Sequence, residues 1–126
     1  LGIGNQMEWA GNVPSEMLTH VYAEADLFLY PSRLEGFGLP LLEAFACGVP
    51  VIASNTTSLP EVAGDAALLI DPESPQAIAK AVKQMMEKPA LRRRYIQRGL
   101  KRAKLFTWEK TARLTLKVYE EEKGKE

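Results

Sequence analysis

The sequence predicts an α/β fold in which helices cover both faces of a parallel sheet. Three continuous apolar runs have the pattern of strands that are buried on both sides, and they are Leu27–Tyr30, Val51–Ala53 and Ala67–Ile70. Segments with apolar residues at helical spacing separate and follow these runs. Because alternating strands and helices are typical of parallel sheets, we expect the three runs to form one sheet in the order written.

Start and stop signals place the helices between and after these strands. Ser15 is expected to cap a helix over Glu16–Ala25. Pro40 suits the first position of the next helix, which Gly48 should end. A short strand is expected at Gln6–Ala10. Four further helices are expected, and they cover Leu59–Ala63, Ser74 to about Glu87, Ala90–Phe106 and Trp108–Glu122, with Thr107 as the cap of the last.

Composition is that of an ordinary globular chain of one domain or part of one. The 126 residues are 46% apolar and 25% charged, which suffices for a small core. Basic and acidic residues number 16 each, so whole-chain charge gives no support for a nucleic-acid or anionic-membrane partner. The basic run from Arg92 to Lys104 is interpreted as a solvated helix face rather than an RNA or lipid site. Cys47 is the single cysteine, which excludes an internal disulfide and fits a reducing, cytoplasmic setting.

The loop after Tyr30 is the candidate ligand site. In parallel α/β sheets, ligands bind beyond the carboxyl ends of the strands, and this loop joins such an end to a helix start. Gly36 and Gly38 allow a sharp turn and a close approach of the backbone to a ligand. The amides of Gly38, Leu39 and Leu41 lie at or near the helix start, where unpaired N–H groups favour a phosphate.

Two carboxylates flank this phosphate-binding position. Glu35 is expected in the loop and Glu43 in the first turn of the helix. Carboxylates repel a phosphate but accept hydrogen bonds from hydroxyl groups on either side of it, a layout that a nucleotide sugar offers as ribose, diphosphate and sugar. A purely structural interpretation stays open, because glycine-rich turns before helices are common and acidic residues near a helix start are favourable by themselves.

Five segments around this loop carry a family resemblance, and they are Ala25–Ser32, Glu35–Pro40, Leu42–Ala44, Gly48–Ser54 and Leu59–Val62. Seven residues lie between Glu35 and Glu43. This pattern resembles glycosyltransferase family 4, the group 1 family of retaining enzymes with two facing Rossmann-like domains, an arrangement called the GT-B fold. The resemblance covers the chain from about Met7 to Tyr119.

The resemblance implies a fold and roles for particular residues. Residues 1–126 would be the C-terminal part of a donor-binding domain, which is a Rossmann-like three-layer sandwich with a parallel sheet. Glu35 is similar to the catalytic glutamate that contacts the donor sugar. Glu43 is similar to the glutamate that holds the ribose hydroxyls. Further donor-binding positions are implied for the segment Gly36, Phe37, Gly38 and Leu39, which holds sugar and diphosphate, and for Asn12 and Val13, which border the base.

The implied reaction is glycosyl transfer with retention, from a UDP- or GDP-sugar to a sugar or lipid acceptor. No cofactor and no metal are expected, because cationic side chains and helix starts can stabilise the leaving diphosphate. Peripheral membrane association of the whole enzyme is left open. The last helix is expected to pack on the N-terminal domain, as it does in the family.

This chain departs from the family pattern in one respect. The family's donor domain begins with a strand ending in Gly-Arg, followed by Lys-Gly, and that Arg and Lys bind the diphosphate; neither pair precedes Glu35 here. The acceptor-binding N-terminal domain and the first strands of the donor domain are expected to be absent too, so the chain alone should be inactive. The rival interpretation is a non-catalytic module that kept the fold, and a reading frame extending upstream would decide against it.

The same departure predicts an open sheet edge. The family's strand order is 3-2-1-4-5-6, and this chain resembles only strands three to six. The two missing strands would lie between Gln6–Ala10 and Leu27–Tyr30. We therefore expect Gln6–Ala10 either to close up against Leu27–Tyr30 or to pair with another chain in a homodimer. A single chain with a bare edge at Leu27–Tyr30 would count against both outcomes.

Overall fold

A parallel three-stranded sheet forms the centre of the molecule in the computed structural model, which describes residues 2–123. Its strands are β1 (Phe28–Tyr30), β2 (Val51–Ser54) and β3 (Ala67–Ile70), adjacent in that order. Both pairings are parallel, with Leu29 opposite Ile52 and Ile52 opposite Leu68. The three strands predicted from apolar runs, their order and the α/β class are therefore confirmed. Burial on both sides is confirmed in full only for β2, because within residues 2–123 no strand or helix covers β1 completely and Leu29 is 38% exposed.

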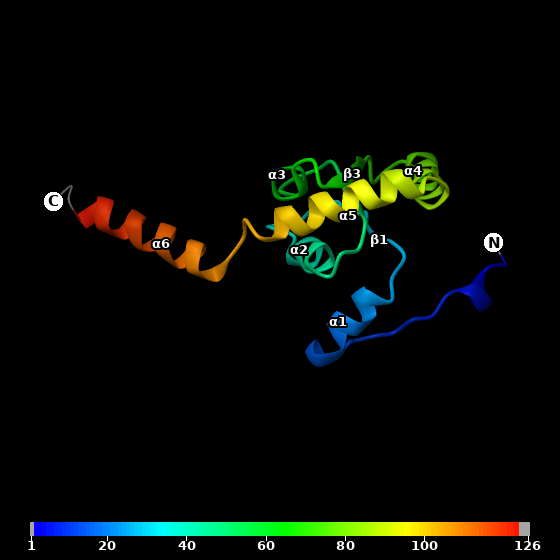
Figure 1. Ribbon diagram of the computed structural model, residues 1–126, viewed down its shortest axis with the longest axis horizontal. Helices are drawn as coiled ribbons and strands as arrows, with labels where there is room; N and C mark the ends of the chain where they lie inside the picture. The colour runs from blue at the N-terminus through cyan, green and yellow to red at the C-terminus, as the bar shows by residue number, and fades with distance from the viewer. Residues whose placement is uncertain (1, 124–126) are drawn as a thin grey trace.

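Alternate residues of β2 face two apolar clusters on opposite sides of the sheet. Val51 and Ala53 belong to a cluster that contains residues of α2 (Leu39–Ala46) and α3 (Leu59–Ala63). Ile52 belongs to a second cluster with residues of α4 (Pro75–Glu87) and α5 (Pro89–Ala103). Figure 1 shows α5 lying across the sheet region between α2 and α3. Helices on both faces give the expected three layers.

Helix α5 lies very close to α2. A Cβ built on Gly99 of α5 would come 2.7 Å from Cδ1 of Phe45 in α2, so only a glycine permits this approach. Phe45 is fully buried there. The basic run of α5 is more than a solvated face, because Arg102 donates hydrogen bonds to the carbonyls of Val62 and Glu61 at 2.9 and 2.6 Å. Those bonds satisfy carbonyls at the end of α3 that the helix itself leaves unpaired.

The expected strand at Gln6–Ala10 is wrong. Gly4–Gln6 form a single 3₁₀ turn, η1, and the following residues are exposed, Trp9 at 94%. Figure 1 shows this N-terminal segment running past α1, away from the sheet. Among the described residues no strand pairs with the outer edge of β1. Closure within the chain therefore does not occur, and pairing of this edge with a second chain stays a prediction. An extended segment with no ladder partner gains nothing from a strand conformation.

Several helix ends differ from the prediction by a few residues. Helix α1 covers Ser15–Ala23, so Ser15 is its first residue and not its cap, and Pro14 precedes it without a side-chain bond. Helix α5 begins at Pro89 and not after it, because proline is tolerated in a first turn. The predicted cap of the last helix is confirmed, because Thr107 Oγ1 accepts from the Lys110 amide at 3.1 Å. Ser74, expected to begin its helix, lies just before α4 as its cap, and its Oγ accepts from the Ala77 amide at 3.2 Å.

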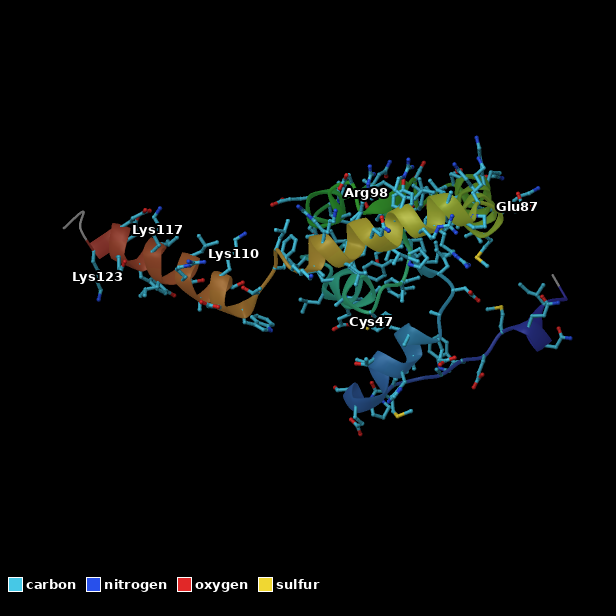
Figure 2. All side chains as sticks on the ribbon, viewed as in Figure 1. Cys47, Glu87, Arg98, Lys110, Lys117 and Lys123 are labelled. Atoms are coloured by element: carbon cyan, nitrogen blue, oxygen red, sulfur yellow. The ribbon has the colours of Figure 1, made fainter. Side chains whose placement is uncertain are left out.

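Helix α6 (Trp108–Lys123) extends away from the body of the molecule (Figure 1). None of its residues is buried. Its side chains, including the labelled Lys110 and Lys117, surround a helix that has no other element beside it in Figure 2. Among residues 2–123, no helix is both long and apolar enough to cross a membrane.

Candidate functional site

The loop of residues 31–38 joins the carboxyl end of β1 to the start of α2. It ends at Gly38, which precedes α2 in a left-handed conformation with φ 102° and ψ 48°. A Cβ at this position would also come 2.6 Å from Cδ2 of the buried Leu59. Backbone geometry and space therefore both require glycine at Gly38. Gly36 differs, because a Cβ there would meet nothing within 4 Å.

Glu35 lies in this loop, as predicted, and two hydroxyl groups hold its carboxylate. Its Oε1 accepts from Tyr30 Oη at 2.6 Å and from Ser32 Oγ at 2.8 Å. These two hydrogen bonds, that of Tyr30 first, hold the pKa of the Glu35 carboxyl below its usual value. Burial and the bond to Glu35 raise the pKa of Tyr30 to about 12. Glu35 is therefore a charged acceptor at neutral pH.

Glu43 lies in the second turn of α2, which corrects the expected first turn. The helix begins at Leu39, so Glu43 is its fifth residue, and no acidic residue occupies the first turn. One carboxylate oxygen of Glu43, Oε2, accepts from Tyr22 Oη at 3.0 Å. Burial, followed by this hydrogen bond, raises the pKa of Tyr22 well above its usual value. The Glu43 side chain is exposed and so remains accessible to a ligand.

The loop after β2 supports the backbone around Glu35, which the sequence did not predict. The Glu35 amide donates to Thr57 Oγ1 at 3.2 Å. Ser58 Oγ donates to the carbonyls of Glu35 and Phe37 at 3.0 and 3.1 Å. Thr57 has φ 53°, which is an outlier for a β-branched residue and places strain next to the site. A signal existed: the polar run of residues 54–58 follows a buried strand that ends at the same sheet edge as β1.

Fewer amides are available at the start of α2 than expected. The Leu41 amide donates to the Gly38 carbonyl at 3.1 Å, so it is already engaged. Pro40 has no amide hydrogen. This leaves the amides of Gly38 and Leu39 as the pair that could face a phosphate at the positive end of the helix dipole.

An apolar hollow of about 670 Å³ lies beside Glu43. Phe37 and Leu39 form one wall of it, and residues from the α5–α6 connection form the other. Phe37 and Phe106 meet edge to face across it, with ring centroids 5.9 Å apart. The guanidinium carbon of Arg102 lies over the ring of Phe106, 5.1 Å from its centroid. The side chain of Phe37 therefore packs against the connection between α5 and α6.

The predicted base-binding residues are not joined to this site. Asn12 is exposed and Val13 is half-buried, in the segment before α1. Within residues 2–123, no hydrogen bond links either of them to the loop of residues 31–38 or to Glu43. Their role at the base stays a prediction. The structure does bring together Glu35, Glu43 and the glycine-rich turn between them.

Comparisons with known proteins agree with this arrangement. Residues 1–102 match the family described as glycosyl transferases group 1. The chain is 48% identical over 113 residues to O-antigen chain mannosyltransferase B of Escherichia coli, covering 90% of this chain and 30% of that protein. It is 34% identical over 124 residues to the MMP alpha-(1->4)-mannosyltransferase of Mycolicibacterium hassiacum, covering 95% of this chain and 30% of that protein. The chain thus spans about 30% of the length of these curated relatives.

Two solved structures share the fold. Sucrose-phosphate synthase from Thermosynechococcus elongatus superposes with a TM-score of 0.86 at 31% identity, over 98% of this chain and 32% of that one. The C-terminal domain of a group 1 glycosyl transferase from Francisella tularensis gives a TM-score of 0.73 at 31% identity, over 82% of this chain and 55% of that one. The two glutamates, the glycine-rich turn and these likenesses point the same way: the chain belongs to the group 1 glycosyl transferases and has part of a GT-B fold.

Proposed function

We propose that this chain contributes part of the donor site of a glycosyltransferase. The whole enzyme moves a sugar from a nucleoside diphosphate to a sugar or lipid acceptor, with retention and without a metal. The observation that carries the proposal is the placement of two fixed carboxylates on either side of a helix start. The relatives named above are mannosyltransferases, which supports a hexosyl donor.

The roles follow from the chemistry of each group. Glu35 accepts hydrogen bonds from hydroxyls of the donor sugar, and Glu43 accepts them from the ribose. The amides of Gly38 and Leu39 face the diphosphate between them, where the positive end of the α2 dipole favours negative charge. The nucleoside diphosphate departs, and the acceptor attacks the same face of the sugar. The remaining positive charge for the leaving group comes from parts of the whole protein beyond this loop.

The two glutamates provide the test. In the whole protein that carries this chain, Glu43→Ala should weaken binding of UDP or GDP by about 1–3 kcal/mol, because it removes a charged acceptor from the ribose. Glu35→Ala should leave that binding nearly unchanged and should lower turnover, because Glu35 contacts only the sugar. Isothermal titration calorimetry measures the first effect, and release of nucleoside diphosphate from UDP- and GDP-sugars measures the second.

Glu87→Ala is the matched control, because Glu87 is an exposed carboxylate at the end of α4 (labelled in Figure 2). It should behave as the wild type in both assays. Equal nucleotide binding by the wild type and Glu43→Ala would contradict the ribose assignment. The 126-residue chain alone should bind these nucleotides only weakly, with a Kd of about a millimolar or higher. Micromolar binding would show that the start of α2 suffices.

The setting of the enzyme follows from its donor. A nucleotide-sugar donor and a lone cysteine fit the cytoplasm. A lipid acceptor would add peripheral contact with a membrane.

A further inference from the structure

Each of the two glutamates has one carboxylate oxygen held by a tyrosine hydroxyl. We propose that Tyr22 and Tyr30 are positioning residues, which fix one oxygen of Glu43 and of Glu35 respectively and so aim the other oxygen at the donor. This inference rests on the proposed function. It adds two residues outside the glycine-rich motif to the machinery of the site.

At Glu35, two donors converge on the same atom. Tyr30 Oη and Ser32 Oγ both donate to Oε1, at 2.6 and 2.8 Å. Among the described residues no hydrogen bond ends on Oε2. A carboxylate has acceptor positions on both oxygens, so Oε2 keeps its full capacity for a sugar hydroxyl. Without the two donors, the side chain could rotate, and fixing it would cost conformational entropy each time a donor binds.

At Glu43, the arrangement is the same but weaker. Tyr22 Oη donates to Oε2 at 3.0 Å, and the described hydrogen bonds leave Oε1 for the ligand. Tyr22 reaches Glu43 from α1, whereas Glu43 stands on α2. The bond therefore holds a carboxylate on an exposed helix surface, where the helix backbone alone would leave several rotamers open.

Phe28 braces both tyrosines. Its ring meets Tyr22 edge to face, with centroids 5.4 Å apart, and stacks on Tyr30, with centroids 5.5 Å apart. Phe28 and Tyr30 lie two residues apart on β1 and so on the same face of the sheet. Three aromatic rings thus link the two carboxylates through one strand. Strand β1 therefore carries Tyr30 itself and the Phe28 ring against which Tyr22 of α1 packs.

A phenylalanine at Tyr22 or Tyr30 would fill the same space as the tyrosine, so this change distinguishes a positioning role of the hydroxyl from a packing role of the ring. A Tyr→Phe change keeps the ring and removes only the hydroxyl that reaches the carboxylate. A hydrogen bond to a charged group is worth roughly ten- to a hundredfold on an equilibrium. Because the hydroxyl acts on the donor only through the carboxylate, we expect an effect at or below the lower end of this range. If the hydroxyls serve only stability, Tyr22→Phe and Tyr30→Phe should both lower the melting temperature, and their effects on nucleotide Kd and on kcat should not differ from each other.

The experiment compares Tyr22→Phe and Tyr30→Phe in the whole protein, with Tyr95→Phe as the control. Tyr95 packs in the opposite cluster of the core, on α5. Tyr22→Phe should raise the Kd of UDP or GDP about three- to tenfold and change kcat less. Tyr30→Phe should lower kcat for donor cleavage about tenfold and change the nucleotide Kd less than twofold. Tyr95→Phe should match the wild type in both measurements. Equal effects of the two changes, or none, would overturn the proposal.

A second measurement ties each tyrosine to its own glutamate. In a Glu35→Ala background, adding Tyr30→Phe should cost almost nothing further, because the acceptor that Tyr30 orients is already gone. Additive losses would overturn the proposal. A different result would refute the proposed function itself: Glu35→Gln and Glu43→Gln variants that bind and turn over donors like the wild type. If both glutamine variants are impaired while both phenylalanine variants are not, the function stands and only the positioning role is refuted.

Discussion

The loop of residues 31–38 and helix α6 are both exposed, but they are attached to the molecule in different ways. The loop is held by side chains from outside it: Ser58 bonds two of its carbonyls, and Thr57 accepts from its Glu35 amide. In α6, side-chain bonds are local, such as Thr115 Oγ1 to the Thr111 carbonyl at 2.9 Å. None of the residues of α6 is buried. Exposure alone therefore does not show how well a segment is ordered.

The difference fits the roles proposed for the two segments. A binding loop must be fixed before the ligand arrives, since loop ordering on binding costs affinity. Helix α6 instead shows an apolar surface that its own chain leaves uncovered, and its most exposed large apolar residues are Trp108, Leu114, Leu116, Val118 and Tyr119. Such surfaces are typical of contacts with another domain. The expectation that α6 packs on an N-terminal domain stays a prediction.

The largest expected effect comes from truncating one leucine in each region. Leu59 is fully buried in α3 under the loop, and its Cδ2 fills the space beside Gly38. Leu59→Ala should lower the free energy of unfolding by about 2–5 kcal/mol, because it leaves a cavity. Leu116→Ala, at a residue 57% exposed on α6, should cost less than about 0.5 kcal/mol in the 126-residue chain. Urea denaturation measures both, and equal costs would refute the contrast.

A smaller effect should separate the two glycines of the loop. Gly38→Ala places a Cβ 2.6 Å from Leu59 at a φ of 102°, so it should cost about 2–3 kcal/mol of unfolding free energy. Gly36→Ala is the matched change in the same loop, and its Cβ would meet nothing within 4 Å. It should alter stability by less than about 1 kcal/mol. A loop that simply moved aside would make the two variants equally stable, which denaturation curves would reveal.

Local sequence signals predicted the body of the fold and the position of the site. Continuous apolar runs that end at Pro31, Ser54 and Asp71 predicted the positions of all three strands, although only β2 is buried at every residue. The link between a strand end and a helix start placed Glu35 correctly. The predicted start of α2 was one residue too late, because the helix begins at Leu39 and not at Pro40. For this reason Glu43 was assigned to the first turn and not to the second.

Contacts that depend on tertiary arrangement were not predictable. The Gln6–Ala10 strand was inferred from local pattern, but a strand also needs a partner, and pairing is decided far away in the sequence. The Tyr22 hydroxyl reaches Glu43, 21 residues later in the chain, only because α1 lies against α2. Thr57 adopts a positive φ that its β-branched side chain disfavours, so its own residue type argued against the observed conformation.

The smallest expected effect is a pH dependence of loop attachment. The bond from Tyr30 lowers the pKa of Glu35 from an unfolded value of 4.5, and burial together with this bond raises the pKa of Tyr30 from 10.0 to about 12. The Glu35 contribution to stability is present above about pH 4.5 and is lost as the pH falls through the lowered pKa. The Tyr30 contribution is present below about pH 10 and is lost as the pH rises toward 12.

Tyr30→Phe removes the Tyr30 contribution and the larger part of the Glu35 contribution, while Ser32 still donates to Glu35. The melting temperature of the wild type should therefore exceed that of Tyr30→Phe by a constant margin near neutral pH, and the margin should shrink in acid, where the Glu35 carboxylate becomes protonated. It should shrink again in strong alkali, where the tyrosine hydroxyl ionises in the unfolded chain. Thermal melts of both proteins at about pH 3, 7 and 11 would detect these changes in the difference between their melting temperatures. A margin that is the same at all three would mean that the hydroxyl contributes packing alone, and the loop would then be held only by the residues after β2.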